Sequence, residues 1–431
     1  MSNRFLIDIG SSTVKVYIRK KQKISMITQK TFDFKKGFCE NRLSDDAKNE
    51  LYDFFEHLVN EYAMTNRNTK LYATGIFRDI CNKNEFIEDF FYKTGLYFNI
   101  ISHNLEAFYL EKAWTNNSSK IEKMVVINIG GKTTELLLCE KGEIIGNPLK
   151  LLIGVGSIIK KFPSINNSIC SYSLDYIVKD IILDISKQIP EIDKKYDVAI
   201  YTGGELTYMR CADYQLVPNT MFSDENHPYM IDTTKYVKRN NEIFSSIPLL
   251  DLKKMMPDNP EWMVGARACS AIAQAIVHYF GISTIIPSNS NLIDGVNIQE
   301  ANNVVICGSF NKHLKQIEVL INNINSKGIT VLSPKNTEVV GAENDFVLFK
   351  DDIVVNHNTW AVEELHLKAI DKCDLVIACN YENYLGVSTT FELIHAYQAG
   401  KKIVFVEDNE IADLFGKRMG KQVMPCEVGL L

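Results

Sequence analysis

Two short segments of the sequence combine glycine with hydroxyl side chains in a pattern that suits phosphate binding. Residues 7–13 read Ile-Asp-Ile-Gly-Ser-Ser-Thr, and residues 127–133 read Ile-Asn-Ile-Gly-Gly-Lys-Thr. A tight turn at glycine brings backbone N–H groups close to an anion, and hydroxyl or ammonium groups add further donors. The predicted phosphate ligands are Gly10, Ser11, Ser12, Thr13, Gly130, Gly131, Lys132 and Thr133.

The two segments occupy matching positions of an internal repeat. Each lies between two apolar runs, which predicts a strand, a tight turn and a second strand. Aligning Gly10 with Gly130, an offset of 120 residues, also aligns Ile9 with Ile129 and Asp8 with Asn128. Either segment alone could be an ordinary β-hairpin. Two of them in a duplicated frame favour a pair of lobes that hold phosphate groups from both sides.

The order of the motifs resembles the exopolyphosphatase / guanosine pentaphosphate phosphohydrolase family, within the superfamily of actin, sugar kinases and heat-shock ATPases. Residues 73–79, Ala-Thr-Gly-Ile-Phe-Arg-Asp, are similar to that family's Ala-Thr-Ser-Ala-x-Arg-Asp segment. The resemblance covers roughly residues 1–300 and is specific because several short motifs recur in order. The similar segments are 7–13, 73–79, 105–107, 128–136, 151–157, 201–204, 262–275 and 292–295.

The resemblance implies hydrolysis of a phosphoanhydride, such as polyphosphate or a guanosine polyphosphate, with Mg²⁺ as cofactor. Glu106 is then the expected base, Asp8 is expected to hold the metal or a water molecule, and Arg78 to contact the transferring phosphate. Gly203 and Gly204 match a later Gly-Gly loop and join the predicted phosphate ligands. Homodimers are common in the resembled family, so a homodimer is a further expectation.

Three replacements distinguish the sequence from the family pattern. Leu105 stands in place of the first residue of an acidic pair, Asn128 in place of an aspartate, and Lys132 in place of a glycine. An amide is a poorer metal ligand than a carboxylate and cannot act as a base. Anion binding is therefore better preserved than hydrolysis, and a non-enzymatic nucleotide sensor is an alternative. A sugar or acid kinase is a weaker alternative, because segments 73–79 and 105–107 speak against it.

The rest of the first 300 residues predicts alternating helices and strands. Apolar residues at helical spacing and the positions of glycine and proline predict helices over 43–62, 78–94, 104–114, 174–189 and 260–280. Short apolar runs predict strands at 71–73 and 197–201. With the family resemblance, the expected fold is α/β, with two duplicated actin-like (ribonuclease H-like) lobes over residues 1–123 and 124–302.

After residue 303 the pattern changes to a regular alternation of strands and helices, with a loop-rich stretch between 333 and 359. Strands are predicted at 304–307, 330–333, 375–379 and 402–406, and helices at 312–327, 359–370 and 389–399. This alternation predicts a small parallel, doubly wound sheet in a separate domain over residues 303–431.

This C-terminal segment resembles the nucleoside 2-deoxyribosyltransferase-like fold, a Rossmann-like sheet that handles nucleosides or nucleotides. Residues 304–310, Val-Val-Ile-Cys-Gly-Ser-Phe, are similar to its first strand and glycine loop, and residues 386–392 to a later helix start. Gly308, Ser309, Ser388 and Thr389 are the expected nucleotide ligands. The resemblance implies that Glu392 is a nucleophile towards the sugar, so an N-glycosidase or deoxyribosyltransferase is another alternative, although Gly386 replaces the family's aspartate.

Composition excludes several classes of protein. Of 431 residues, 46% are hydrophobic and 23% are charged, which is typical of a globular protein and not of a disordered chain. The formal net charge of -6 disfavours binding of bulk nucleic acid. No apolar run reaches the roughly 18 residues of a membrane span. The 10 cysteines form no CxxC pair and no targeting signal is visible, so we expect reduced thiols in a cytoplasmic protein.

Overall fold

The computed structural model describes most of the chain and divides it into two compact units. The first unit is Met1–Tyr109 together with Val296–Leu431, and the second is Leu110–Gly295. The three domains expected from the sequence, 1–123, 124–302 and 303–431, stay a prediction. The described residues are 4–11, 13–20, 23–32, 34, 37–167, 171–189, 195–222, 224–257, 259–299, 301–326, 329–343, 346–350 and 359–424.

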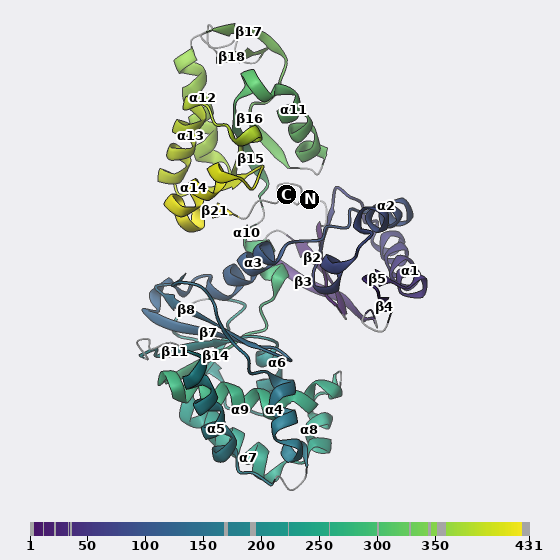
Figure 1. Ribbon diagram of the computed structural model, residues 1–431, viewed down its shortest axis with the longest axis vertical. Coiled ribbons are helices and arrows are strands. Elements are labelled where there is room, and N and C mark those ends of the chain that lie inside the picture. The colour runs from purple at the N-terminus through teal and green to yellow at the C-terminus, as the bar shows by residue number, and fades with distance from the viewer. Residues whose placement is uncertain are drawn as a thin grey trace. The chain divides into compact units, whose positions relative to one another are not determined.

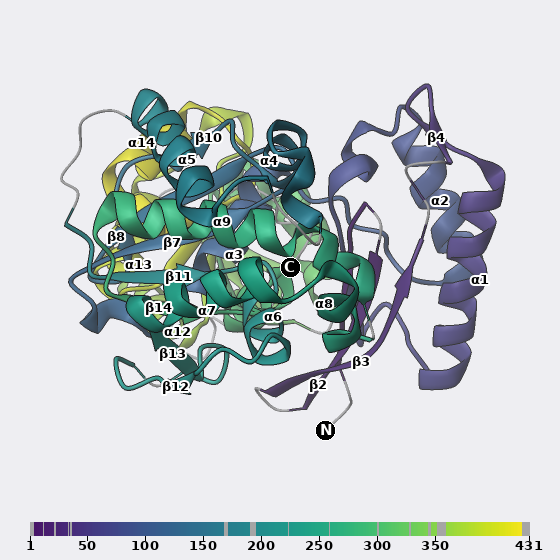
Figure 2. The ribbon, with the colours of Figure 1, turned by 90° about the horizontal axis from the view of Figure 1, so that it is seen from below.

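The N-terminal part of the first unit is a mixed sheet covered by two helices. Its strands lie in the order β3-β2-β1-β6, antiparallel except for the parallel pair β1–β6. The helices α1 and α2 lie side by side against this sheet (Figures 1 and 2). The elements are β1 (Arg4–Ile9), β2 (Thr13–Lys20), β3 (Lys23–Thr31), β4 (Phe38–Cys39), β5 (Arg42–Leu43), α1 (Asp45–Tyr62), β6 (Thr69–Ala73), α2 (Lys83–Thr94) and α3 (His103–Thr115).

Local sequence explains why α1 forms where it does. The side chain of Ser44 accepts a hydrogen bond from the backbone N–H of Ala47 and caps the helix start. Leu51, Phe55 and Leu58 recur at helical spacing and are buried in a core rich in phenylalanine. Burial of this apolar face, at about 25 cal/mol for each Å² removed from water, holds the helix on the sheet.

The helix expected over residues 78–94 is shorter in the structure. A 3₁₀ turn, η1 (Gly75–Asp79), carries Arg78, and α2 begins only at Lys83. Ile80 has an extended backbone with ψ 123°, and the N–H of Cys81 donates to the carbonyl of Asn41 instead of to a helical partner. Because the N–H of Cys81 is bonded to a distant residue, it does not form the helical hydrogen bond that the sequence pattern predicted, and the helix starts later.

The second unit contains a larger mixed sheet. Its main path is β10-β8-β7-β11-β14-β13-β12, with β9 paired to β8, and β7, β11 and β14 run parallel to one another. The helices α5, α7 and α9 cover one face of this sheet (Figure 2). The strands are β7 (Lys123–Ile129), β8 (Thr134–Glu140), β9 (Glu143–Ile144), β10 (Leu149–Leu151), β11 (Val198–Tyr201), β12 (Val217–Pro218), β13 (Tyr229–Asp232) and β14 (Thr284–Pro287).

The central helix of the second unit is α9, which is buried along nearly its whole length. Five alanines between Ala266 and Ala275 allow the neighbouring α5 and the sheet to approach closely. Its last residue is Phe280, and the following Gly281, with φ 71° in the left-handed region, caps the helix end. The helices of this part are α4 (Val155–Lys161), α5 (Leu174–Gln188), α6 (Glu205–Cys211), α7 (Thr233–Ser246), α8 (Leu249–Met255), α9 (Met263–Phe280) and α10 (Leu292–Gln299).

The hairpins β1–β2 and β7–β8 have the same register at the offset of 120 residues that the sequence suggested. Ile9 pairs with Val14 in the first, and Ile129 pairs with Thr134 in the second. The predicted mixed α/β fold with parallel sheets is confirmed. Short 3₁₀ turns complete the described segments: η2 (Ser118–Lys120), η3 (Pro163–Asn166), η4 (Pro260–Trp262), η6 (Tyr381–Asn383) and η7 (Gly420–Gln422).

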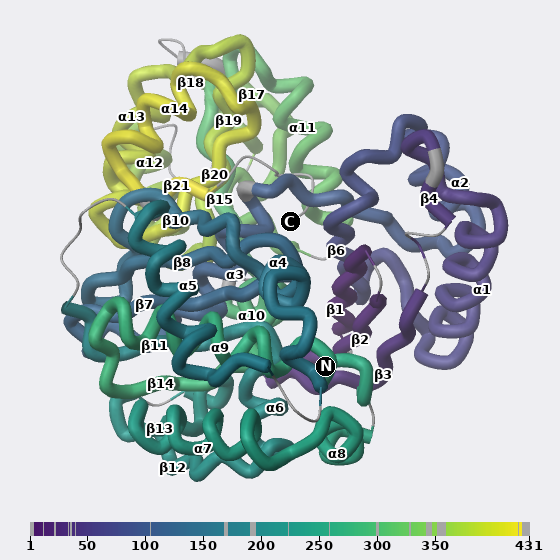
Figure 3. The backbone as a smooth tube through the Cα atoms, turned by 60° about the horizontal axis from the view of Figure 1, so that its bottom comes forward, coloured from purple at the N-terminus to yellow at the C-terminus, as the bar shows by residue number. Residues whose placement is uncertain are grey.

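The C-terminal part of the first unit is a five-stranded sheet in the order β16-β15-β19-β20-β21, with every pair parallel. It is the green to yellow part of the tube in Figure 3. The loop-rich stretch expected after residue 333 contains a β-hairpin instead. The elements are β15 (Asn303–Gly308), α11 (Phe310–Ser326), β16 (Thr330–Ser333), β17 (Val339–Glu343), β18 (Phe346–Phe349), α12 (Thr359–Lys372), β19 (Leu375–Cys379), α13 (Val387–Gln398), β20 (Lys402–Phe405), α14 (Glu410–Met419) and β21 (Val423–Met424).

Alternate residues of these parallel strands form the core under α12, α13 and α14. Val305, Cys307, Val376 and Ala378 pack with Ile370, Leu393 and Ala412. Among the described helices, none has the length and apolar content needed to cross a bilayer.

Candidate functional site

The first glycine turn, loop 1 (residues 10–13), closes the hairpin between β1 and β2. The backbone N–H of Gly10 donates to the carbonyl of Thr13 over 2.9 Å. The hydroxyl of Ser11 accepts from the N–H of Ile76 over 3.2 Å and so joins loop 1 to η1. Ser12, another predicted phosphate ligand, lies outside the described residues.

Gly75 makes the contact between loop 1 and η1 possible. Its φ of 62° lies in the left-handed region, and a Cβ atom built there would come within 2.0 Å of the Ser11 hydroxyl oxygen. A side chain at this position would have to displace the Ser11 hydroxyl, and with it the hydrogen bond that joins loop 1 to η1, the 3₁₀ turn that carries Arg78.

Arg78 is held by three partners, one for each nitrogen of its guanidinium group. Its Nε donates to the carbonyl of Ile101 over 2.8 Å, and Nη1 lies 2.6 Å from Nδ1 of His103. Its Nη2 forms an ion pair with Oε2 of Glu106, in the first turn of α3. Both members of this pair are mostly buried, which strengthens their attraction relative to an exposed pair.

His103 is a site residue that the sequence interpretation did not include. It lies three residues before Glu106 on α3, so the two side chains share one face of the helix. This spacing of three residues was the feature of the sequence that could have identified His103 as a neighbour of Glu106. Leu105 is buried in the protein core, so the position where the resembled family has an acidic residue contributes apolar packing here.

Asp8 lies near the end of β1, two residues before Gly10, and is half-buried. Burial raises its pKa from 3.8 to about 6, the positive charge of Lys15 opposes this shift, and the negative charge of Glu106 adds to it. Lys15 is the direct cross-strand partner of Asp8 in the β1–β2 hairpin. The first unit thus brings together two carboxylates, a guanidinium group and a glycine turn.

The second glycine turn, loop 2 (residues 130–133), has the same closure and an additional support. The N–H of Gly130 donates to the carbonyl of Thr133 over 2.8 Å. The carbonyls of Gly130 and Gly131 accept from the N–H groups of Val155 and Gly156 at the start of α4, over 3.1 and 2.8 Å. Loop 2 is therefore fixed to α4, while the side chain of Lys132 is exposed.

We expect Gly154→Ala to lower the free energy of unfolding by about 1–3 kcal/mol, the usual cost of overpacking. A Cβ atom at Gly154 would lie 2.5 Å from the carbonyl carbon of Lys132 and 2.7 Å from the nitrogen of Thr133. Chemical denaturation measures the effect. Gly131→Ala is the matched control, because a Cβ atom there meets nothing within 4 Å. Equal losses in both variants would contradict this steric account.

Gly203 and Gly204 follow β11 and precede α6. Both have left-handed backbone angles, φ 102° and 96°. The N–H of Thr202 donates to the carbonyl of Ile127 over 2.9 Å, so this turn and loop 2 follow neighbouring parallel strands. The carboxyl ends of parallel strands meet at one edge of a sheet, where ligands commonly bind. Asn128 lies half-buried near the end of β7.

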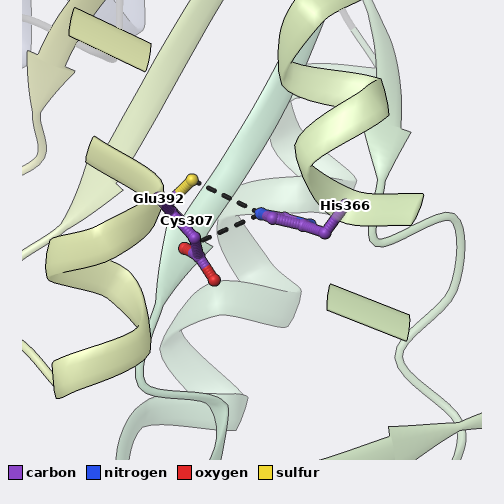
Figure 4. Close-up of side chains that lie close together, drawn as sticks. All are labelled: Cys307, His366 and Glu392. Carbon is purple, nitrogen blue, oxygen red and sulfur yellow. Dashed lines mark hydrogen bonds and ion pairs between the residues drawn. The ribbon is translucent and has the colours of Figure 1, made fainter. Parts of the chain in front are cut away.

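The C-terminal part of the first unit carries its own group of polar side chains (Figure 4). Cys307 on β15, His366 on α12 and Glu392 on α13 form what we call the buried triad. Nε2 of His366 lies 3.4 Å from Sγ of Cys307 and 3.7 Å from Oε2 of Glu392. Nδ1 of His366 lies 2.7 Å from the hydroxyl oxygen of Ser333.

Burial controls the protonation of the buried triad. It raises the pKa of Glu392 from 4.5 to about 8, to which the charge of Glu363 adds, and it lowers the pKa of His366 from 6.5 to about 4. It also raises the pKa of the Cys307 thiol well above its ordinary value. The Glu392 carboxyl is therefore mostly protonated at pH 7, which suits a proton donor better than the nucleophile that the resemblance implied.

The other nucleotide ligands expected in this segment surround the end of β15 and the start of α13. Gly308 ends β15 and is buried, and Ser309 follows it, half-buried. Thr389 is buried in the first turn of α13, whereas Ser388 is exposed. These positions stay predictions as nucleotide ligands.

Comparison with known proteins places these features in a family. The Ppx/GppA phosphatase family matches residues 8–302. A bifunctional 3-dehydroquinate synthase/phosphatase from Fusobacterium nucleatum is 24% identical over 322 residues, covering 68% of this chain and 46% of that protein. The chain thus spans about half the length of this curated relative.

Two solved structures share the fold. The type II variant of the Aquifex aeolicus Ppx/GppA phosphatase has a TM-score of 0.54 at 20% identity, over 70% of this chain and 99% of that one. An exopolyphosphatase from Cytophaga hutchinsonii has a TM-score of 0.50 at 13% identity, over 69% and 97%.

Proposed function

This chain belongs to the Ppx/GppA phosphatase family, and on that premise we propose that it hydrolyses a phosphoanhydride bond of a nucleotide or of a short polyphosphate. Membership of the family supports a phosphohydrolase. The observation that carries the proposal is the convergence of Asp8, Arg78 and Glu106 beside loop 1. They come from β1, η1 and α3, three segments that are far apart in the sequence.

Glu106 is the proposed base. Its carboxylate would take a proton from the attacking water while the phosphate groups lie against the N–H and hydroxyl donors of loop 1. The ion pair with Arg78 fixes the orientation of this carboxylate, and His103 and Ile101 in turn fix Arg78. In this arrangement Arg78 is a positioning residue for Glu106, in addition to its proposed contact with phosphate.

Asp8 is the residue that would hold Mg²⁺. A carboxylate oxygen is a preferred ligand of this ion, which usually binds one or two carboxylates together with substrate phosphates. The half-buried position of Asp8, within the range of the Glu106 charge, fits a cation of this kind. Bound there, the ion would neutralise charge on the phosphate oxygens.

The charge of the chain favours a small substrate over a long polyanion. The formal net charge is -6, and the proposed phosphate ligands are mostly backbone N–H and hydroxyl groups of loops 1 and 2. A long polyphosphate chain would need an extended row of cationic side chains to offset its charge. A nucleotide presents only a few phosphates, which the N–H and hydroxyl donors of a glycine turn can accommodate.

We expect Glu106→Gln to lower kcat for phosphate release by about 10²- to 10⁴-fold, because it removes the general base. The shape of the side chain is kept, so KM should change little. The measurement is Mg²⁺-dependent release of inorganic phosphate from guanosine pentaphosphate, nucleoside triphosphates and short polyphosphate. Glu88→Gln, at an exposed position of α2, serves as the control.

Three outcomes would contradict hydrolysis at Glu106. If the variant releases phosphate as fast as the unchanged protein, another group is the base. If the unchanged protein binds one of these ligands in calorimetry but releases no phosphate, the non-enzymatic sensor is the better description. Lack of binding of any phosphate ligand would exclude both.

A second candidate is an N-glycosidase or deoxyribosyltransferase activity in the C-terminal segment, favoured by the buried carboxyl of Glu392 on α13. Release of a free base from a nucleoside or nucleotide that survives Glu106→Gln but not Glu392→Ala would identify it. The cytoplasmic location and the homodimer stay predictions.

A further inference from the structure

The donor atoms of the buried triad are arranged like the first ligands of a metal ion. The Cys307 sulfur, the His366 Nε2 and a Glu392 carboxylate oxygen all lie within 4.8 Å of one another. Bonds of about 2.3 Å to sulfur and 2.0–2.2 Å to nitrogen and oxygen put tetrahedral donors about 3.3–3.7 Å apart. The observed separations of 3.4 Å and 3.7 Å around Nε2 are close to these values.

Direct hydrogen bonds leave one carboxyl oxygen of this cluster without a partner. A neutral imidazole nitrogen has one lone pair, so Nε2 of His366 cannot accept from both Cys307 and Glu392 at once. Glu392 is only 8% exposed, and its Oε2 is buried without a hydrogen-bond partner. A buried carboxyl oxygen without a partner is costly in a protein interior unless a ligand binds it. Figure 4 shows the carboxylate and the sulfur both directed towards the imidazole.

We propose that Cys307, His366 and Glu392 bind a divalent transition-metal ion of the zinc type. A thiolate, an imidazole and a carboxylate together form a donor set that zinc accepts and that Mg²⁺ or Ca²⁺ does not favour. Three protein ligands leave a fourth position for water or another small ligand. The site is separate from the carboxylates of the proposed phosphohydrolase centre and does not depend on that function.

The surroundings of His366 are those of a metal ligand. The ring nitrogen that faces away from the triad, Nδ1, lies 2.7 Å from the hydroxyl oxygen of Ser333 at the end of β16. If Nδ1–H donates to this oxygen, the lone pair of Nε2 is free for the ion. Metal-bound histidines commonly have such an outer partner, which fixes the tautomer and the ring orientation. Strand β15 and helices α12 and α13 supply the three ligands, so the site rests on regular elements and not on loops.

Co²⁺ is a spectroscopic probe for this site in the full chain after treatment with a chelator. We expect one Co²⁺ to bind per chain, with a thiolate-to-cobalt charge-transfer band in the near ultraviolet and displacement by Zn²⁺. Cys307→Ser should abolish that band, and Glu392→Gln should weaken binding at least tenfold. Ser333→Ala should keep the band but weaken binding by about 10- to 100-fold, as expected for an outer partner.

Two cysteine variants control for adventitious thiol binding. Cys81→Ser removes an exposed thiol, and Cys373→Ser removes a buried thiol outside the triad; neither should alter the band. If Cys307→Ser fails to fold, the nearly isosteric Glu392→Gln is the second test, because Zn²⁺ should raise the Tm of the unchanged protein more than that of this variant at the same concentration. A missing thiolate band in the unchanged protein, or a band that survives Cys307→Ser, overturns the proposal.

Discussion

Asp8→Asn is expected to abolish phosphate release and, at the same time, to raise the free energy of unfolding at pH 7 by up to about 3 kcal/mol. Burial raises the pKa of Asp8 from 3.8 to about 6 in the folded chain. Each unit of this difference corresponds to about 1.4 kcal/mol of preference for the protonated form. At pH 7 the carboxylate is ionised in both states, so the folded state bears the full cost of burying its charge. The neutral amide does not bear this cost.

The sign of this effect predicts its dependence on pH. The folded state binds the proton of Asp8 more tightly than the unfolded state, so ionisation of Asp8 destabilises the fold as pH rises from 3.8 through 6. The increase in the free energy of unfolding caused by Asp8→Asn should therefore be largest above pH 6 and disappear near pH 4. Urea denaturation at pH 7, 5.5 and 4 measures it, with the exposed Asp53→Asn as control. A gain that is absent at pH 7, or unchanged at pH 4, would show that burial of charge is not the cause.

Arg267→Ala is expected to lower the free energy of unfolding by about 3–5 kcal/mol, among the largest effects of a single replacement. Arg267 on α9 is 1% exposed. Its Nη1 donates to the carbonyls of Ile165 and Asn167, and its Nη2 to those of Ile243 and Ile247. Removing the guanidinium group leaves buried carbonyls unsatisfied, at about 1–3 kcal/mol each before water or relaxation compensates.

Arg267→Lys tests how much of the stability depends on the positive charge and how much on the planar shape of the guanidinium group. A lysine keeps one positive charge but lacks the planar fork that reaches carbonyls on two sides, so we expect about half of the loss seen with alanine. The control is Arg239→Ala on α7, which is half-buried and should cost about 1 kcal/mol or less. Chemical denaturation measures all three variants. A loss below about 1 kcal/mol for Arg267→Ala would mean that water replaces the guanidinium group.

The sequence predicted local features well. Helix α1 and strands β6 and β19 follow from apolar residues such as Leu51 and Phe55, whose spacing is a property of neighbouring positions. The helix predicted to begin at Arg78 was wrong in its start, because the N–H of Cys81 bonds to a residue about 40 positions earlier in the chain. The hairpin of β17 and β18 was missed, because its residues carry no clear alternation of apolar and polar side chains.

In the candidate sites, too, the sequence predicted the local motifs but not the contacts that depend on tertiary packing. The glycine turns and the residues Asp8, Arg78 and Glu106 were recognised from short motifs, and the structure brings these three residues together. The partnership of Arg78 with His103 depends on how η1 meets α3, which no motif encodes. Cys307 and His366 are 59 positions apart, and only the packing of α12 on β15 brings them together. Glu392 was expected from its motif, but its burial was not.

The attachment of loop 2 to α4 determines how freely that loop can change shape. Its carbonyls are bound to the N–H groups of Val155 and Gly156, and the segment that follows α4 is bound in turn to Arg267 through the carbonyl of Ile165. Residues 154–165 are thus anchored at both ends to regular structure. Loop 2 is therefore preorganised. If a phosphate group binds there as proposed, it would not have to immobilise a disordered segment, and little conformational entropy would be lost.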